Sequence, residues 1–124
     1  MDAPTPPTTP APELVGIAKA IKDLDLLIRA LLTSLPASKP WQRQLRLHLV
    51  HADGLLQVWR MTVAMNRSDA DVLQAARDLL VPLRAANVYM SSGRADAGTK
   101  QAIRLGFMLA QRAAASLEAQ GGRT

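Results

Sequence analysis

Three loop-forming clusters divide the chain into four segments of helical periodicity, and this division limits the fold more than any other sequence feature. The clusters are Pro36 with Pro40, residues 66–69 (Asn-Arg-Ser-Asp) and residues 91–93 (Ser-Ser-Gly). Proline and glycine interrupt helices, while asparagine, serine and aspartate favour turns and helix starts. Long helical segments joined by short loops predict an all-α fold, an antiparallel up-down four-helix bundle over residues 13–120.

The amino-acid composition agrees with an all-helical domain. Of the 124 residues, 21 are alanine and 19 are leucine, whereas valine and isoleucine together number 11 and aromatic residues 4. Alanine and leucine favour helices, and β-branched and aromatic residues favour strands. A chain of this length is expected to form one small domain. Because it has no cysteine, a disulfide framework, a thiolate zinc site and a cysteine nucleophile are excluded.

Both ends of the chain are expected to lie outside the bundle. Residues 1–12 contain five prolines and lack the basic and apolar regions of a signal peptide, which predicts a disordered Pro-rich tail. Residues 121–124 are expected to be a flexible C-terminus. Charged residues from Lys19 to Arg29 interrupt the most hydrophobic stretch, so we expect no membrane span and a cytoplasmic protein.

Three of the four segments each carry one apolar stripe at spacings of three and four residues, which is typical of a helix that packs on its neighbours. Ser68 is expected to cap the third helix and Pro82 to kink it, and the fourth helix is expected to begin between Asp96 and Thr99. The expected core stripes are Leu14, Ile17, Ile21, Leu24, Ile28, Leu31 and Leu35; then Val72, Ala76, Leu79, Leu83, Ala86 and Met90; then Ile103, Gly106, Ala110, Ala113 and Leu117.

The second segment, predicted as a helix over residues 40–66, has two apolar faces. Its inner stripe consists of Trp41, Leu45, Leu49, Ala52, Leu56, Trp59 and Val63. At about 100° per residue, a second set falls on the opposite side: Leu47, Val50, Gly54, Val58, Met61 and Met65. The outward face of a helix in a monomeric bundle is normally charged, so we expect this set to form an oligomer interface. The alternative is that the helix is central and packed on both sides.

Several short motifs follow the order and spacing of a known superfamily. They are Leu35-Pro36 followed by Trp41 and Leu45, residues 64–68 (Ala-Met-Asn-Arg-Ser), Leu83-Arg84, and residues 105–109 (Leu-Gly-Phe-Met-Leu). Over about residues 14–118 the chain resembles the four-helix-bundle superfamily of 23S rRNA intervening-sequence proteins and accessory variability determinants of diversity-generating retroelements.

This resemblance implies an antiparallel bundle that assembles into a ring, a homopentamer in known relatives, with a basic surface. The retroelement accessory proteins are not enzymes; they bind a reverse transcriptase and nucleic acid. The intervening-sequence branch has no settled biochemical role. The Leu-Arg motif of the family falls on Leu83-Arg84, which implies that Arg84 contacts a partner.

The distribution of charge gives a second reason to expect nucleic acid as a partner. The formal net charge is +5, and residues 39–124 hold twelve Lys and Arg against six Asp and Glu. A ring of n subunits would multiply the charge to 5n, creating a positive field that attracts RNA or DNA through its phosphates. The candidate binding residues are Arg84, Arg77, Arg46, Arg60, Lys100 and Arg104. The alternative is that these bases are only solvated.

His48 and His51 are three residues apart, a spacing that can place two imidazoles near one metal ion. The sequence offers no third histidine, no cysteine and no paired carboxylates, so we expect no metal, no cofactor and no catalytic site. The alternative, a metal-assisted enzyme, is weaker. Two hypotheses therefore lead: a non-enzymatic oligomer that binds nucleic acid and a reverse transcriptase, or a structural, scaffolding oligomer whose partner is another protein.

Overall fold

The structure is a computed structural model that describes residues 12–121, with side chains described for residues 16–120. This part of the chain forms four helices and no strand: α1 (Pro12–Ser34), α2 (Pro40–Ala64), α3 (Asp69–Ser91) and α4 (Ala97–Gly121). The predicted all-helical fold is therefore confirmed in this range. Pro12 and Gly121 are helical, so α1 and α4 begin or end one residue beyond the predicted boundaries, and proline is tolerated in the first turn of a helix. The rest of the two expected tails lies outside the described residues.

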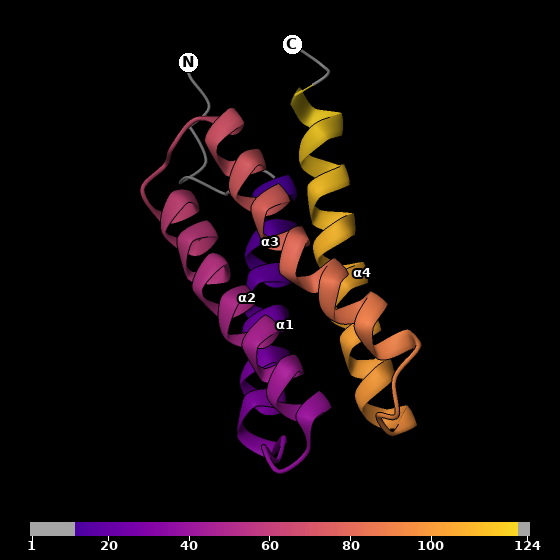
Figure 1. Cartoon of the computed structure of the whole chain (residues 1–124). Helices are drawn as coiled ribbons and strands as arrows, with labels where there is room; N and C mark the ends of the chain where they lie inside the picture. Colours follow the sequence, from indigo (N-terminus) through magenta and orange to yellow (C-terminus); the bar gives the residue numbers. More distant parts are fainter. Residues whose placement is uncertain (1–11, 122–124) are drawn as a thin grey trace, which may run out of the picture.

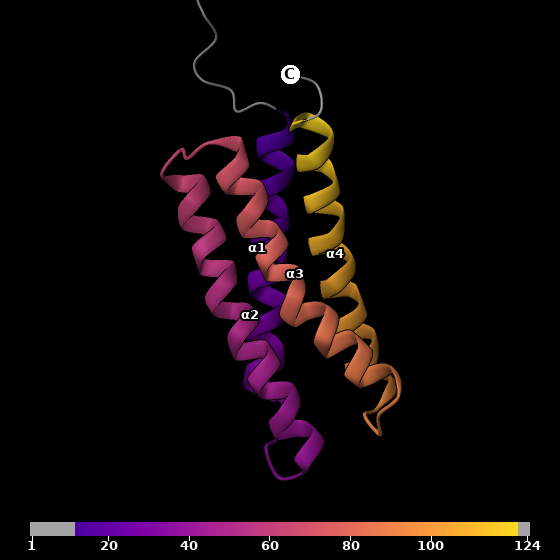
Figure 2. The same ribbon diagram turned by 45° about the horizontal axis from the view of Figure 1, so that its top comes forward.

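Each helix packs on two others, and no diagonal pair is in contact among the described residues. The contacting pairs are α1 with α2, α2 with α3, α3 with α4, and α4 with α1. Successive helices run in opposite directions, and both views show α1 behind α2 and α3 (Figures 1 and 2). The packing partners of α2 are thus α1 and α3, and the face of α2 that points away from the bundle has no helix against it. The alternative of a central, fully covered α2 is wrong for the single chain.

Side chains near the loops explain where the helices begin and end. Ser68 Oγ accepts a hydrogen bond from the backbone N–H of Asp71 at 3.2 Å, as expected for the cap of α3. The helix α2 ends at Ala64, two residues earlier than predicted, because Asn66 adopts a positive φ of 54° that ends helical geometry. The α4 helix begins at Ala97, inside the predicted window, and Asp96 accepts hydrogen bonds from the N–H and hydroxyl groups of Thr99.

Gln42 fixes the start of α2 in a way that the sequence did not predict. This side chain is buried, and its Oε1 atom accepts hydrogen bonds from the backbone N–H groups of Ser38 and Lys39 at 3.1 and 3.0 Å. The guanidinium of Arg43 donates to the carbonyls of Ala37 and Ser38. Together these bonds satisfy polar backbone groups of the α1–α2 loop, which would otherwise lack partners.

The apolar stripes form a core with two clusters. The larger one joins all four helices and contains residues such as Leu24, Trp59 and Leu79. The smaller one lies toward the α1–α2 and α3–α4 loops and contains Leu35, Leu45, Leu49, Ala86, Met90, Ala95 and Ile103. The predicted stripes of α3 and α4 are buried throughout, and those of α1 and α2 are buried except for Leu31, Trp41 and Val63, which are half-buried, and Leu14, whose side chain lies outside the described residues.

Two residues shape how the helices pack. Pro82 is buried inside α3 and has no N–H to donate to the carbonyl of Asp78, and Figure 2 shows α3 changing direction near its middle, as predicted. A Cβ atom at Gly106 of α4 would lie 3.1 Å from Leu27 Cδ2 of α1. The lack of a side chain at Gly106 therefore lets α1 and α4 approach closely, in agreement with the small-residue stripe.

Candidate interaction surfaces

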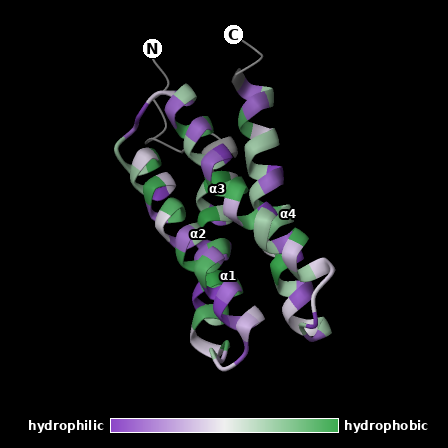
Figure 3. Cartoon of the chain, in the orientation of Figure 1, coloured by the Kyte–Doolittle hydropathy of each residue, from purple (hydrophilic) through white to green (hydrophobic). Residues whose placement is uncertain are grey.

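The outward face of α2 is apolar along most of its length. The described side chains of Leu47, Val50, Val58, Met61 and Met65 are exposed by 66, 55, 52, 59 and 60%. Gly54 lies among them, and no atom of the chain would lie within 4 Å of a Cβ placed there. The hydropathy colouring shows apolar segments along α2 in the view of Figure 3. The single chain thus leaves all six predicted interface positions uncovered.

This apolar face continues onto α3, which sequence periodicity alone did not reveal. Val81 and Val88 are each 61% exposed, and they line a shallow groove of about 590 Å³ with His48, Arg84, Ala85, Tyr89 and Ser92. We call the exposed residues of α2 together with Val81, Ala85 and Val88 the α2–α3 apolar surface. An exposed apolar area of this extent is typical of an interaction site. Val81 and Val88 are seven residues apart and therefore share a side of α3, but the stripe predicted for this segment was the buried one.

His48 lies at the edge of the α2–α3 apolar surface. Its ring centroid is 6.1 Å from that of Tyr89, and its Nε2 atom is 3.3 Å from Gln44 Nε2. Burial, and to a smaller degree repulsion from His51, lowers the pKa of His48 below its ordinary value of 6.5. The described part of the chain contains no group of three or more His, Cys, Asp or Glu residues that could hold a metal ion. At this edge the imidazole of His48 packs against the ring of Tyr89.

Two of the six candidate bases face α1. The guanidinium of Arg46 donates to the carbonyl of Leu32 at 2.9 Å, and the Arg60 Nη2 atom is 3.4 Å from Asp25 Oδ2. Asp25 also accepts a hydrogen bond from Arg29 at 2.9 Å, and this bond holds the pKa of Asp25 below its ordinary value of 3.8. Arg46 and Arg60 thus connect α1 to α2, and they lie on the side of the bundle opposite α3 and α4.

The other four candidate bases lie along the side formed by α3 and α4, which we call the α3–α4 basic face. Arg77 of α3 forms an ion pair with Glu118 of α4. The Arg84 guanidinium lies over the Phe107 ring, 5.8 Å from its centroid, in a cation–π contact. Lys100 and Arg104 line a hollow between the two helices near their loop. The six candidate bases therefore do not form one patch, because Arg46 and Arg60 lie on the α1–α2 side of the bundle and the other four lie on the opposite side.

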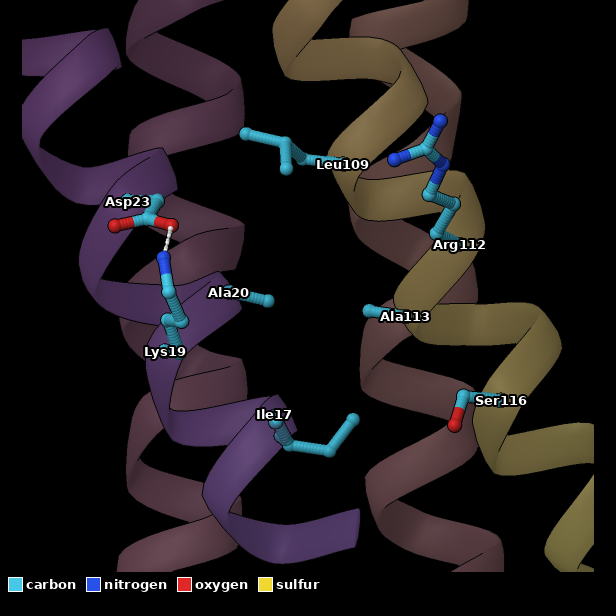
Figure 4. A pocket seen from close by; sticks show the side chains of 9 residues that line it. Ile17, Lys19, Ala20, Asp23, Leu109, Arg112, Ala113 and Ser116 are labelled. Atoms are coloured by element: carbon cyan, nitrogen blue, oxygen red, sulfur yellow. Dashed lines mark hydrogen bonds and ion pairs between the residues drawn. The ribbon is translucent and has the colours of Figure 1, made fainter. Parts of the chain in front are cut away.

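A different hollow lies between α1 and α4 and is lined by residues such as Ile17, Ala113 and Ser116. Figure 4 shows Lys19 and Asp23 forming an ion pair on α1, while Arg112 lies across the hollow on α4. The Lys19 Nζ to Asp23 Oδ2 distance is 2.7 Å. Because an acid neutralises the lysine here, this hollow has less cationic character than the one beside Lys100 and Arg104.

Comparison of the chain with protein-family models, with curated proteins and with solved structures finds no match. No helix within residues 12–121 is both long enough and apolar enough to cross a membrane.

Proposed function

We propose that the protein is a non-enzymatic, self-associating four-helix bundle that binds nucleic acid through its α3–α4 basic face. The observation that carries the proposal is the uncovered apolar face of α2, where Leu47, Val58 and Met61 are each more than half exposed. Exposing these side chains to water is unfavourable, at roughly 25 cal/mol per Å² of apolar area, and a second copy of the chain would remove them from water. The assembly we propose is a ring, as the family resemblance implies.

Gly54 supports the choice of this face as a contact between subunits. A glycine inside a helix costs about 1 kcal/mol relative to alanine, and here no neighbour within the chain requires the missing side chain. A glycine at the centre of an apolar helix face allows the backbone of another subunit to approach closely. Gly106 has this role inside the chain, where Leu27 of α1 packs against it.

The α3–α4 basic face supports nucleic acid as the partner of the assembly. Arg84, Lys100 and Arg104 lie along this side, and none of them forms an ion pair with another side chain of residues 16–120. Guanidinium and ammonium groups bind phosphate oxygens, and contacts of this kind carry no sequence information. Repetition of the face around a ring would raise affinity through avidity. A reverse transcriptase is the protein partner that the resemblance adds to this proposal.

The first experiment measures the native mass. The protomer has a mass of 13.4 kDa, and we expect light scattering after gel filtration to give a multiple of this value. Val58→Glu should return the protein to its protomer mass, since a buried carboxylate without a partner is unfavourable at an interface. Leu26→Glu on α1, where the side chain is 59% exposed, is the matched control and should leave the assembly intact. A protomer mass for the unmodified chain would refute self-association.

The second experiment measures binding of fluorescently labelled RNA and DNA of unrelated sequences at two salt concentrations. Phosphate contacts predict that affinity falls steeply as salt is raised. Arg84→Ala should weaken binding of all the sequences alike, because Arg84 makes no base-specific contact in this proposal. Binding that is absent, or that is insensitive to salt, would contradict the nucleic-acid role.

A scaffolding oligomer with a protein partner is the second candidate function, and the contacts of the cations favour it in one respect. Arg46, Arg60 and Arg77 are engaged with Leu32, Asp25 and Glu118, so half of the candidate bases already stabilise contacts between helices. Under this alternative the remaining positive charge serves only to keep the assembly soluble. An oligomeric mass combined with no binding of RNA or DNA at low salt would favour the scaffold.

A further inference from the structure

The hollow between α3 and α4 combines two cations with neutral hydrogen-bond donors. It has a volume of about 320 Å³ and is lined by Asn87, Met90 and Ser91 of α3 and by Ala97, Lys100, Gln101 and Arg104 of α4. Its volume falls at the lower end of the range of about 300–1,000 Å³ found for ligand pockets. Met90, whose side chain is buried, is one of the lining residues. The hollow therefore has room for a small group, and two of the side chains that line it are cations.

The charges that line this hollow are all positive. Lys100 and Arg104 are one helical turn apart, and neither forms an ion pair with a described side chain. Asp96, one turn before Lys100, directs its carboxylate oxygens to the N–H and hydroxyl groups of Thr99 instead. Elsewhere on the bundle, Arg77 and Lys19 are each paired with an acid. The hollow thus holds two neighbouring cations that lack a counter-charge within the described chain.

The donors in the hollow match the acceptors of a phosphate group. Arg104 can offer two parallel N–H groups to two phosphate oxygens, and Lys100 offers a compact positive charge. The amide groups of Asn87 and Gln101 can each donate to a further oxygen. The Ser91 hydroxyl donates to the carbonyl of Val88, so it is not counted among these donors.

The hollow also lies near Arg84. Arg84 contacts Phe107 on α4, and Phe107 is about one turn from Arg104, so Arg84 lies about one helical turn from the hollow. Arg84 also borders the groove lined by Val81 and Val88. We propose that the hollow binds one backbone phosphate of a polynucleotide through Arg104, Lys100 and the two amides, beside a second phosphate at Arg84. This assignment rests on the proposed function and makes it specific: the α3–α4 side holds a strand at a built site, not only through a diffuse field.

The test compares two exposed arginines of α4 in the full-length protein. Arg104→Gln removes a cation from the hollow, whereas Arg112→Gln removes the same charge from the α1 side of α4. We expect Arg104→Gln to lower the affinity for labelled RNA or DNA about tenfold and Arg112→Gln to change it less than about twofold. The slope of log affinity against log salt should fall by about 1 for Arg104→Gln alone. Equal effects of the two variants would overturn the assignment of a phosphate site to the hollow and leave the proposed function intact.

A second measurement uses inorganic phosphate as the probe. Backbone amide NMR signals of Asn87, Lys100 and Gln101 should shift and saturate as phosphate is added, and Lys100→Gln with Arg104→Gln should abolish the shifts. Acetate at matched ionic strength is the control, and equal shifts with acetate would overturn the phosphate assignment. Saturable phosphate shifts without any polynucleotide binding would refute the proposed function while supporting the hollow. If phosphate caused no saturable shift, the assignment of a phosphate site to the hollow would be overturned.

Discussion

The arginines of the bundle differ in what their side chains contact, and this difference separates structural cations from candidate binding groups. Arg46 binds the backbone of α1, Arg60 binds Asp25, and Arg77 binds Glu118. Arg84 and Arg104 have no carboxylate partner in the described part of the chain. Arg84 and Arg104 keep their donors available for an external anion, so substituting them should weaken binding. Substituting Arg46, Arg60 or Arg77 should instead lower stability.

Asp25, the partner of Arg60, provides a test of the contacts that stabilise the fold. The Arg29 hydrogen bond lowers its pKa in the folded protein, so the folded state favours the ionised carboxylate. This contribution to stability is present above about pH 4 and is lost as pH falls through the lowered pKa of the folded state. Asp25→Asn should therefore be less stable than the unmodified protein at pH 7, and the difference should shrink toward pH 2. Urea unfolding at several pH values measures the difference.

Asp78→Asn is the matched control for this experiment. It removes an exposed carboxylate on α3 that accepts a hydrogen bond from Gln74 of the same helix. Because this contact does not join two helices, the control should show a smaller loss of stability at pH 7. If both variants lost the same stability with the same pH dependence, the cluster around Asp25 would have no special role.

The helices themselves were predictable because their signals are local. Apolar residues three and four apart identify a buried stripe, and Ser68, Asn66 and Asp96 mark helix boundaries within a few residues. The partners of the cations were not predictable in this way. Arg77 and Glu118 are 41 residues apart, and the hollow joins Asn87 to Arg104, so both depend on how α3 and α4 pack. The core follows from periodicity and most helix boundaries follow from single residues such as Ser68, but the candidate site follows from which sides of the helices face each other.

The cap of α3 can be tested by one substitution. Ser68→Ala removes the hydroxyl that accepts from the N–H of Asp71, and we expect unfolding free energy to fall by about 1 kcal/mol. Ser116→Ala, an exposed position inside α4, is the control and should not lower stability, since alanine is more favourable than serine in a helix interior. Denaturant unfolding of the two variants under the same conditions gives the comparison. Equal stabilities would show that the Ser68 hydroxyl does not stabilise α3.

Two glycines inside helices distinguish packing within the chain from packing between chains. In a dilute protomer, Gly54→Ala should raise the unfolding free energy by about 1 kcal/mol, because a new Cβ there meets no atom within 4 Å. Gly106→Ala should raise the unfolding free energy by less, because its Cβ would lie 3.1 Å from Leu27 Cδ2 and that side chain must move. The measurement is denaturant unfolding at low protein concentration. A larger gain at Gly106 than at Gly54 would contradict this reading of the α1–α4 contact.

At the scale of the whole bundle, many of the exposed large apolar side chains lie on α2 and α3. The α2–α3 apolar surface combines side chains such as Leu47, Val58 and Val88, all more than half exposed, whereas the outward side of α1 carries Lys19, Lys22 and Arg29 around Leu26. Four helices of this length bury one stripe each, and two faces of α2 exceed what α1 and α3 can cover. The excess on α2 and α3 is the physical reason to expect further copies of the chain.

Self-association predicts that thermal stability depends on protein concentration. When the folded assembly dissociates on unfolding, mass action raises Tm as the protein becomes more concentrated. We expect Tm of the unmodified chain to rise over a hundredfold range of concentration. Leu47→Glu places a carboxylate on the α2–α3 apolar surface, where Leu47 is 66% exposed in the single chain, and should make Tm independent of concentration. Leu26→Glu on α1 should retain the dependence. A Tm that is constant for the unmodified chain would show that the single bundle is stable with its apolar surface in water.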